Sequence, residues 1–308
     1  MDLKKIETII EEPIREINEI SYGYTNQIYS INNRYIFKSC VTENNYKNFQ
    51  RASEFCKKYY GIINCPKVIY SCLEPENKNM WQIEEKAKGV NLSFKWGELN
   101  NEEKEDVIGK ICESLRSIHN IPIGDVFESA MNENDWKEKF RKDIEKKINS
   151  LIKKGMNYNE LYSRIRNYVG KNIESLDETN FKICHTDMHF DNILIDDEKN
   201  ITVLDYDRLR IASIDYELNI FNVMQKTPRL IVNDKIKEKI KDNEYTGILN
   251  LLSEKYNEMF EFKDLDKRLN IYGIKHYLGL LSVVKDKNTI LKVLNDITNE
   301  RVVEEHER

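Results

Sequence analysis

The first part of the chain alternates between short runs of β-forming residues and clusters of turn residues. Asn32-Asn33-Arg34 separates two such runs, as expected for a hairpin turn. Residues 44–60 instead place apolar side chains on one face at helical spacing. The predicted strands are residues 28–31, 35–40, 67–73 and 80–86. This pattern predicts a small antiparallel β-sheet with one inserted helix.

The hydrophobic spacing becomes helical after Gly89. One β-like segment interrupts the helices, and it contains two short strands, at residues 193–195 and 201–204. The chain then returns to helical spacing from residue 213 onward. The long helices predicted before this segment are residues 102–119, 135–154 and 158–176.

The length of the chain favours two lobes. A chain of 308 residues exceeds what one hydrophobic core usually serves, because single cores stop growing at about 250–300 residues. We therefore predict an α+β fold with two lobes. The N-terminal lobe, residues 1–88, is a small antiparallel β-sheet with one helix, and the C-terminal lobe, residues 89–308, is larger and mainly helical.

Charge and cysteine content narrow the class of partner. The formal net charge is −5, so the chain as a whole lacks the basic surface that a phosphate backbone requires. The N-terminus is charged from the start, and the longest apolar-rich run, residues 277–284, is too short to span a membrane. The six cysteines form no C-x-x-C pair. We expect a cytoplasmic protein with reduced thiols and with neither a nucleic-acid nor a membrane partner.

The β-like segment contains the most informative chemistry. A polar loop with Asp187 and Asn192 leads into the two short strands, and Asp205 follows the second strand. Acidic side chains at the ends of buried strands need partners, because burying a charge is costly. Oxygen ligands from Asn192 and Asp205 would suit Mg²⁺, which takes one or two carboxylates plus substrate phosphates. Asp187 would then be free to orient the proton of a nucleophile. The alternative is that these acids form only an exposed loop and a turn.

The pattern H-x-D-x-x-x-x-N, here His185 to Asn192, followed by Asp205 in an apolar strand, resembles the aminoglycoside phosphotransferase and choline kinase-like family. Proteins of this family have the protein kinase-like fold. The resemblance implies that Asp187 is the catalytic Asp that accepts the proton of the acceptor hydroxyl. It also implies that Asn192 and Asp205 bind Mg²⁺, with ATP or GTP as co-substrate.

The resemblance extends to the nucleotide site. Lys38 lies on a predicted strand where the family's phosphate-binding Lys is expected. Its helical Glu partner stays open between Glu54 and Glu43. The segment with Gly23, Thr25 and Asn26 resembles the nucleotide-positioning loop, although it lacks the G-x-G-x-x-G pattern. Backbone groups near two residues, Glu85 and Ala87, are expected to bind the base.

One residue departs from the family pattern, and the role of another is left open. Thr186 occupies the position after the His where Gly is usual, and Asp207 follows Asp205 and either contacts the metal or is simply exposed. His185 is expected to brace the loop through hydrogen bonds. No activation segment or A-P-E motif is present, which disfavours a protein kinase.

The combined prediction is a small-molecule kinase that transfers the γ-phosphoryl group of ATP or GTP to a hydroxyl. An aminoglycoside-like acceptor, and hence an antibiotic-resistance role, is the leading choice by resemblance alone. A metabolic kinase for choline, ethanolamine, a sugar or homoserine is an alternative. A non-catalytic, nucleotide-binding relative is another. We expect a monomer or a weak dimer.

Overall fold

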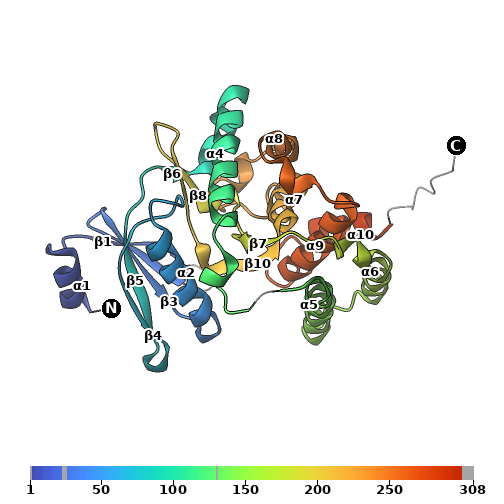
Figure 1. Cartoon of the computed structure of the whole chain (residues 1–308), viewed down its shortest axis with the longest axis horizontal. Coiled ribbons are helices and arrows are strands. Elements are labelled where there is room, and N and C mark those ends of the chain that lie inside the picture. Colours follow the sequence, from blue (N-terminus) through green and yellow to red (C-terminus); the bar gives the residue numbers. More distant parts are fainter. Residues whose placement is uncertain (1, 23–25, 130, 300–308) are drawn as a thin grey trace. The chain divides into compact units, whose positions relative to one another are not determined.

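The computed structural model describes residues 2–22, 26–129 and 131–299. The chain forms two compact units (Figure 1). The first consists of Met1–Glu128 and Ile183–Arg210, and the second of Ser129–Lys182 and Ile211–Arg308. The boundary expected between residues 88 and 89 lies inside the first unit. Whether it separates a nucleotide lobe from an acceptor lobe stays a prediction.

The first unit is built on a five-stranded antiparallel sheet with the order β1-β2-β3-β5-β4. The strands are β1 (Ile17–Tyr22), β2 (Asn26–Ile31), β3 (Tyr35–Cys40), β4 (Val68–Glu74) and β5 (Asn79–Glu85). Four of them were predicted, and β1 is additional. The β2–β3 turn is confirmed: Asn32 and Asn33 have left-handed backbone angles, φ 52° and 54°, which Asn tolerates better than most residues.

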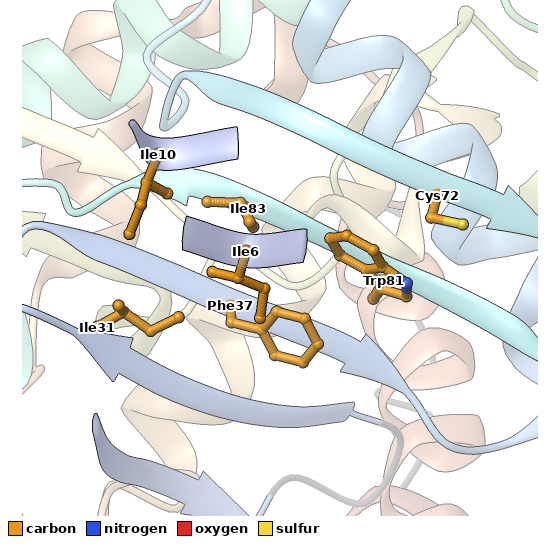
Figure 2. Close-up of a cluster of buried hydrophobic side chains, with 7 residues drawn as sticks. All are labelled: Ile6, Ile10, Ile31, Phe37, Cys72, Trp81 and Ile83. Atoms are coloured by element: carbon orange, nitrogen blue, oxygen red, sulfur yellow. The ribbon is translucent and has the colours of Figure 1, made fainter. Parts of the chain in front are cut away.

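The two faces of this sheet have different chemistry because side chains alternate along each strand. One face is apolar, and α1 (Leu3–Ile10) covers it. Ile6 and Ile10 of α1 are buried against a cluster drawn in Figure 2, whose other members are Ile31, Phe37, Cys72, Trp81 and Ile83. Helix α1 was not predicted from the sequence, although Ile6 and Ile10 are four residues apart, as on one face of a helix.

The opposite face carries the polar side chains Lys38 and Gln82, which lie opposite each other on β3 and β5. The inserted helix α2 (Tyr46–Tyr59) belongs to this face, with Phe49 buried against Cys40 and Met80. Polar groups buried beneath this helix need hydrogen-bond partners within the protein. The sheet therefore separates an apolar core on one side from a polar centre on the other.

The rest of the first unit positions a short hairpin. It contains β6 (Val90–Asn91), α3 (Leu92–Lys95), α4 (Asn101–His119), β8 (Ile193–Ile195) and β9 (Ile201–Val203), and β6, β8 and β9 form a three-stranded sheet. Gly89 is needed just before β6. Its φ is +99°, and a Cβ there would lie 2.3 Å from the carbonyl oxygen of Ile195.

The second unit is helical. Its helices are α5 (Glu133–Lys153), α6 (Asn159–Asn172), α7 (Leu218–Lys226), α8 (Ile248–Lys255), α9 (Leu265–Leu280) and α10 (Lys287–Asn299), while β7 (Phe181–Cys184) and β10 (Arg210–Ser213) carry the chain between units. Its core is aromatic, with Trp136 packed edge-on against Phe140 and Tyr216. Tyr272 joins this cluster and is fully buried.

The predicted α+β class is confirmed, as are the predicted strand hairpin at residues 193–204 and the long helices. All six cysteines are buried, and no disulfide joins them in the described part of the chain. Across those same residues, no helix has both the length and the apolar character that crossing a membrane requires. The cytoplasmic location and the oligomeric state stay predictions.

Candidate active site

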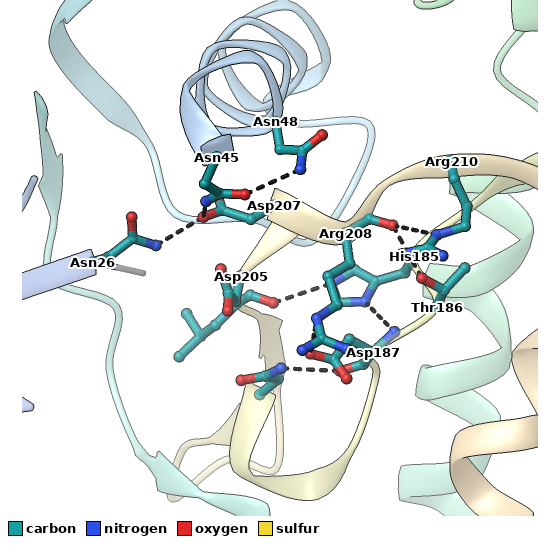
Figure 3. Close-up of polar contacts among 12 residues, drawn as sticks. Asn26, Asn45, Asn48, His185, Thr186, Asp187, Asp205, Asp207, Arg208 and Arg210 are labelled. Carbon is teal, nitrogen blue, oxygen red and sulfur yellow. Dashed lines mark hydrogen bonds and ion pairs between the residues drawn. The ribbon is translucent and has the colours of Figure 1, made fainter. Parts of the chain in front are cut away.

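The loop between β7 and β8 is held by His185. The buried imidazole lies with Nε2 3.0 Å from the carbonyl oxygen of Leu204, and its Nδ1 accepts a hydrogen bond from the backbone N–H of Asp187 at 3.3 Å (Figure 3). These two contacts assign the tautomer with the proton on Nε2. His185 thus ties the loop to the strand end after β9, which agrees with the bracing role expected for it.

Asp187 points its carboxylate toward a cation that the sequence analysis did not consider. Arg208 Nε lies 3.2 Å from Asp187 Oδ2. The Asp187 side chain is mostly buried, whereas Arg208 is largely exposed. Arg208 follows Asp205 in the short 3₁₀ turn Tyr206–Arg208. The sequence contained one indication of Arg208, namely its position three residues after the candidate metal ligand Asp205. Only the fold shows that Arg208 contacts Asp187 in the loop between β7 and β8.

Asn192 ends the loop with its amide oriented by one hydrogen bond. Its Nδ2 donates to the carbonyl oxygen of Asp187 at 2.9 Å, and its Oδ1 has no hydrogen-bond partner among the described residues. The backbone N–H of Leu204 donates to the Asn192 carbonyl at 2.7 Å. Asn192, just before β8, and Asp205, just after β9, therefore lie at the same end of the β8–β9 hairpin.

Asp205 has an unusual backbone and an open side chain. Its φ is 59° in the left-handed region, where a non-glycine residue is under strain. The side chain remains 40% exposed, and Lys38 Nζ donates to Oδ1 at 2.9 Å. Surrounding protein atoms raise the pKa of Asp205, but the charge and hydrogen bond of Lys38 outweigh them and lower it below the usual value. Asp205 is therefore ionised at neutral pH.

Lys38 is buried between two carboxylates. Its Nζ lies 2.9 Å from Asp205 Oδ1 and 3.2 Å from Asp207 Oδ1, and its side chain is 11% exposed. Burial alone would lower the pKa of Lys38, but Asp205, Asp207 and Glu84 together raise it above its usual value. The ammonium is thus a fixed positive charge on the polar face of the sheet.

Asp207 is the second partner of Lys38 and the more enclosed of the two acids. Its side chain is 7% exposed. Oδ1 faces Lys38, and Oδ2 accepts hydrogen bonds from Asn26 Nδ2 at 2.7 Å and from Asn45 Nδ2 at 3.2 Å. Figure 3 shows Asn26 and Asn45 converging on this carboxylate. Asp207 is therefore not an exposed residue, which answers one of the alternatives left open by the sequence.

Neither helical Glu considered as a partner reaches Lys38 through an ion pair. Glu43 pairs with Lys78, and Glu54 accepts a hydrogen bond from Gln50. Glu84 on β5 is a further acid near Lys38. Burial raises the pKa of its carboxyl despite the attraction of Lys38. The carboxylates that bind Lys38 belong instead to Asp205, which precedes the 3₁₀ turn after β9, and to Asp207 within that turn.

The residues expected to bind the nucleotide base lie at the end of β5. Glu85 is exposed and pairs with Lys67 at 2.8 Å, and its backbone N–H donates to the Lys67 carbonyl. Ala87 is half-buried, and its backbone groups have no hydrogen-bond partner in the described part of the chain. They are therefore available to a ligand. Gly23 and Thr25 lie outside the described residues, whereas Asn26 is engaged with Asp207.

Thr186, which departs from the family pattern, has a φ of 62°. This left-handed conformation is unfavourable for a β-branched residue and free of strain for Gly. The Thr186 hydroxyl donates to the carbonyl oxygen of Arg208 at 3.0 Å. This hydrogen bond offsets part of the backbone cost and fastens the loop beside Asp187 to the segment that carries Arg208.

The arrangement fits a magnesium ion bound by protein oxygens. Asp205 presents an ionised, open carboxylate, and Asn192 presents an amide oxygen without a protein partner. Mg²⁺ prefers such hard oxygen ligands and keeps several waters or phosphate oxygens besides. Lys38 supplies a fixed positive charge beside them. The first unit thus brings together a fixed cation and oxygen ligands of the kinds that a nucleoside triphosphate and its Mg²⁺ require.

The antiparallel sheet and the helical unit are those of the protein kinase-like fold. With the H-x-D-x-x-x-x-N loop, they define a phosphotransferase. The family model described as "Phosphotransferase enzyme family" matches residues 16–230. That match covers more than half of the chain, and the chain belongs to this family.

Solved structures of similar fold include aminoglycoside phosphotransferases. The ADP-bound APH(2'')-Ib is 15% identical with a TM-score of 0.67, covering 97% of each chain. The gentamicin complex of APH(2'')-IIa is 16% identical with a TM-score of 0.68, covering 97% of this chain and 95% of that one. A thermostable mutant of APH(4)-Ia with ADP and hygromycin B is 12% identical, with a TM-score of 0.67, over 96% and 97% of the two chains. At these identities the likeness establishes the fold.

Proposed function

We propose that this phosphotransferase transfers the γ-phosphoryl group of ATP or GTP to a hydroxyl of a small molecule. The observation that carries the proposal is the hairpin end itself. Asp187, Asn192 and Asp205 come together there, and Lys38 is bound to the open carboxylate of Asp205. A purely structural ion pair would have little reason to leave that carboxylate open.

Each residue has a distinct role in this proposal. Asn192 and Asp205 hold Mg²⁺, which when bound would neutralise charge on the phosphates. Lys38 binds phosphate oxygens as a point charge. Backbone groups near Ala87 and Glu85, and the loop with Gly23, Thr25 and Asn26, bind the nucleotide.

Asp187 accepts the proton of the acceptor hydroxyl as the hydroxyl oxygen attacks the γ-phosphorus. The bond between that phosphorus and the bridging oxygen of the nucleoside diphosphate breaks in the same transfer. Arg208, through its contact with Asp187, keeps the carboxylate in one orientation. In phosphoryl transfer the protein contributes mainly such positioning together with electrostatic stabilisation.

An aminoglycoside-like acceptor is the first choice, which would make this an antibiotic-resistance enzyme. The support is the fold shared with aminoglycoside phosphotransferases whose solved complexes contain gentamicin or hygromycin B. A metabolic kinase for ethanolamine, a sugar, homoserine or choline is the second candidate. Choline would require aromatic side chains that surround its quaternary ammonium group. Tyr272 and Tyr277 do not offer such a cage, because both are fully buried. The face of Phe140 is already used, because the ammonium of Lys275 lies 4.6 Å from its ring centre.

The test is acceptor-dependent release of nucleoside diphosphate by the purified chain. Mg-ATP and Mg-GTP would each be offered with aminoglycosides, choline, ethanolamine, homoserine and small sugars. Asp187→Ala is the inactive blank. Asp197→Ala, at an exposed position in the β8–β9 turn, is the matched control. Release that depends on one acceptor, persists in Asp197→Ala and disappears in Asp187→Ala identifies the substrate class.

Two other results would point elsewhere. Nucleotide binding without turnover on any acceptor, including a wider metabolite panel, would favour a non-catalytic nucleotide-binding relative. Full activity in Asp187→Ala would show that another group accepts the proton.

A further inference from the structure

Asp207 is a buried acid that the proposed transfer does not use. It lies two residues after Asp205, and both carboxylates contact the same ammonium, that of Lys38. The two acids nevertheless differ in access. Asp205 is 40% exposed at its side chain, whereas Asp207 is 7% exposed.

The contacts of Asp207 argue against a role as a metal ligand. Its two oxygens already accept hydrogen bonds from Lys38, Asn26 and Asn45. Mg²⁺ requires near-octahedral geometry and usually keeps several waters. A carboxylate enclosed by three protein donors has no solvent-accessible lone pair for a metal ion. It also leaves no space for the waters that the metal would keep.

The shared ammonium creates a competition at Asp205. A metal ion at Asp205 and the Lys38 ammonium bind the same carboxylate. If Lys38 had no other anion, its whole charge would face Asp205 and oppose the binding of a cation there. Asp207 supplies the other anion from the buried side, where its carboxylate is only 7% exposed to solvent.

We propose that Asp207 is a positioning residue that holds Lys38 and thereby keeps Asp205 available to a divalent cation. This inference rests on the proposed metal role of Asp205. Asn26 and Asn45 fix the Asp207 carboxylate from two sides, from the start of β2 and from the residue preceding α2. The ammonium then stays at one place when the metal and the nucleotide bind.

The test measures metal binding directly, with Mn²⁺ as the probe. Free Mn²⁺ is followed by electron paramagnetic resonance in the presence of the full chain and the β,γ-imido analogue of ATP or GTP. In Asp207→Asn the carboxylate charge is lost while the shape is kept. We expect Mn²⁺ affinity to fall about 5-fold to 100-fold, the usual size of coupling between two sites. The Mg²⁺ requirement of the reaction should rise in parallel, with kcat largely recovered at saturating Mg²⁺.

Three further variants make the result specific. Asp205→Asn should abolish the Mn²⁺ site, and Asp197→Asn in the β8–β9 turn should leave it unchanged. In the Lys38→Met background, Asp207→Asn should have no further effect on Mn²⁺ affinity, because the shared cation is gone. If the wild-type chain binds no Mn²⁺ with the nucleotide analogue, or Asp205→Asn binds it normally, the proposed function fails, independently of Asp207.

Several outcomes would overturn the role of Asp207. Unchanged Mn²⁺ affinity in Asp207→Asn, or loss of the site as complete as in Asp205→Asn, would do so. An equal effect with and without Lys38 would also contradict it. If Asp207→Asn does not fold, Asn45→Ala decides, because it keeps the charge of Asp207 but removes one of the hydrogen bonds that fix its carboxylate. Weaker Mn²⁺ affinity in Asn45→Ala that disappears in the Lys38→Met background supports the proposal. Unchanged affinity in Asn45→Ala, or an equal loss with and without Lys38, contradicts it.

Discussion

Each unit contains a cluster in which a buried cation meets a carboxylate. In the second unit Arg268 and Asp215 are both 0% exposed at their side chains and form a bidentate pair, with N–O distances of 2.7 and 2.8 Å. Asp215 also accepts a hydrogen bond from Tyr272, and Arg268 donates to the carbonyl oxygens of Ser175 and Glu178. In the first unit the Lys38 side chain is also largely buried, at 11% exposed, but that of Asp205 is 40% exposed.

The difference lies in how completely the charges are satisfied. In the Arg268 cluster both oxygens of Asp215 are used, and burial raises the pKa of the Tyr272 phenol, so that it stays protonated as a donor. Such a cluster has no capacity for a ligand. In the Lys38 cluster one carboxylate is filled by protein donors and the other is open. A buried cation beside an open carboxylate indicates binding, whereas a closed network indicates a structural role.

The comparison is tested most strongly by neutralising the open carboxylate. Asp205→Asn should lower phosphoryl transfer by about 10³-fold or more, because metal-ion charge stabilisation contributes several kcal/mol. The free energy of unfolding should change by less than about 1 kcal/mol, since the lost pair is partly exposed. Steady-state kinetics and urea unfolding measure the two effects. A large loss of stability would place Asp205 with the structural clusters.

The closed cluster should respond in the opposite way. Asp215→Asn leaves the Arg268 charge buried without a full partner, and we expect a loss of about 3–5 kcal/mol in the free energy of unfolding. Activity per folded molecule should be retained at a temperature where the variant is folded. Urea unfolding checks the first effect, and assays at low temperature check the second. Normal stability would contradict the structural interpretation.

Arg208 should have an intermediate effect on rate. Arg208→Gln removes the contact with Asp187, and we expect kcat to fall about 10-fold to 100-fold through poorer orientation of the carboxylate. Because Arg208 is exposed, stability should hardly change. Arg208→Lys should recover part of the rate, and Arg210→Gln, which does not remove an Asp187 contact, serves as the control. An unchanged kcat in Arg208→Gln would remove Arg208 from the site.

An ion pair of the second unit, between Asp143 and Lys275, should contribute to the free energy of unfolding in a pH-dependent way. Burial raises the pKa of Asp143, but the charge and hydrogen bond of Lys275 outweigh it and hold that pKa below 3.8. A lowered folded-state pKa stabilises the fold above the unfolded-state value, and this stabilisation is lost as pH falls. Asp143→Asn should therefore cost up to about 1 kcal/mol above pH 5 and progressively less below pH 4. Urea midpoints at several pH values test this, with the exposed Asp234→Asn as control.

The smallest effect concerns the strained loop residue. Thr186→Ala keeps a Cβ at positive φ but loses the hydroxyl bond to Arg208, which should cost about 1 kcal/mol. Thr186→Gly also loses the bond but relieves the backbone, so it should be about 1 kcal/mol more stable than Thr186→Ala. Thermal unfolding ranks the two. If Ala were the more stable, the strain at Thr186 would be negligible.

Much of the fold followed from local pattern. The Asn32-Asn33 turn, the helical spacing after Gly89 and the short hairpin were predicted because each depends on residues close in sequence. The N-terminal helix α1 was not predicted, because the helix is short and its two buried isoleucines are stabilised by packing against a sheet formed by later residues. The base-binding role of Ala87 and the catalytic role of Asp187 stay predictions, although their positions are compatible with them.

The sequence by itself determined the class of protein. The H-x-D-x-x-x-x-N pattern and Asp205 lie within one continuous segment, so their spacing can be counted directly in the sequence. Only the tertiary structure decided the partner of Lys38. Within the described residues neither Glu43 nor Glu54 forms an ion pair with Lys38, and Asp205 and Asp207, far along the chain, bind it instead. Sequence spacing constrains groups on one element. Charge pairing between distant elements depends on which side chains the fold buries together, because burial is what makes a cation require an anion.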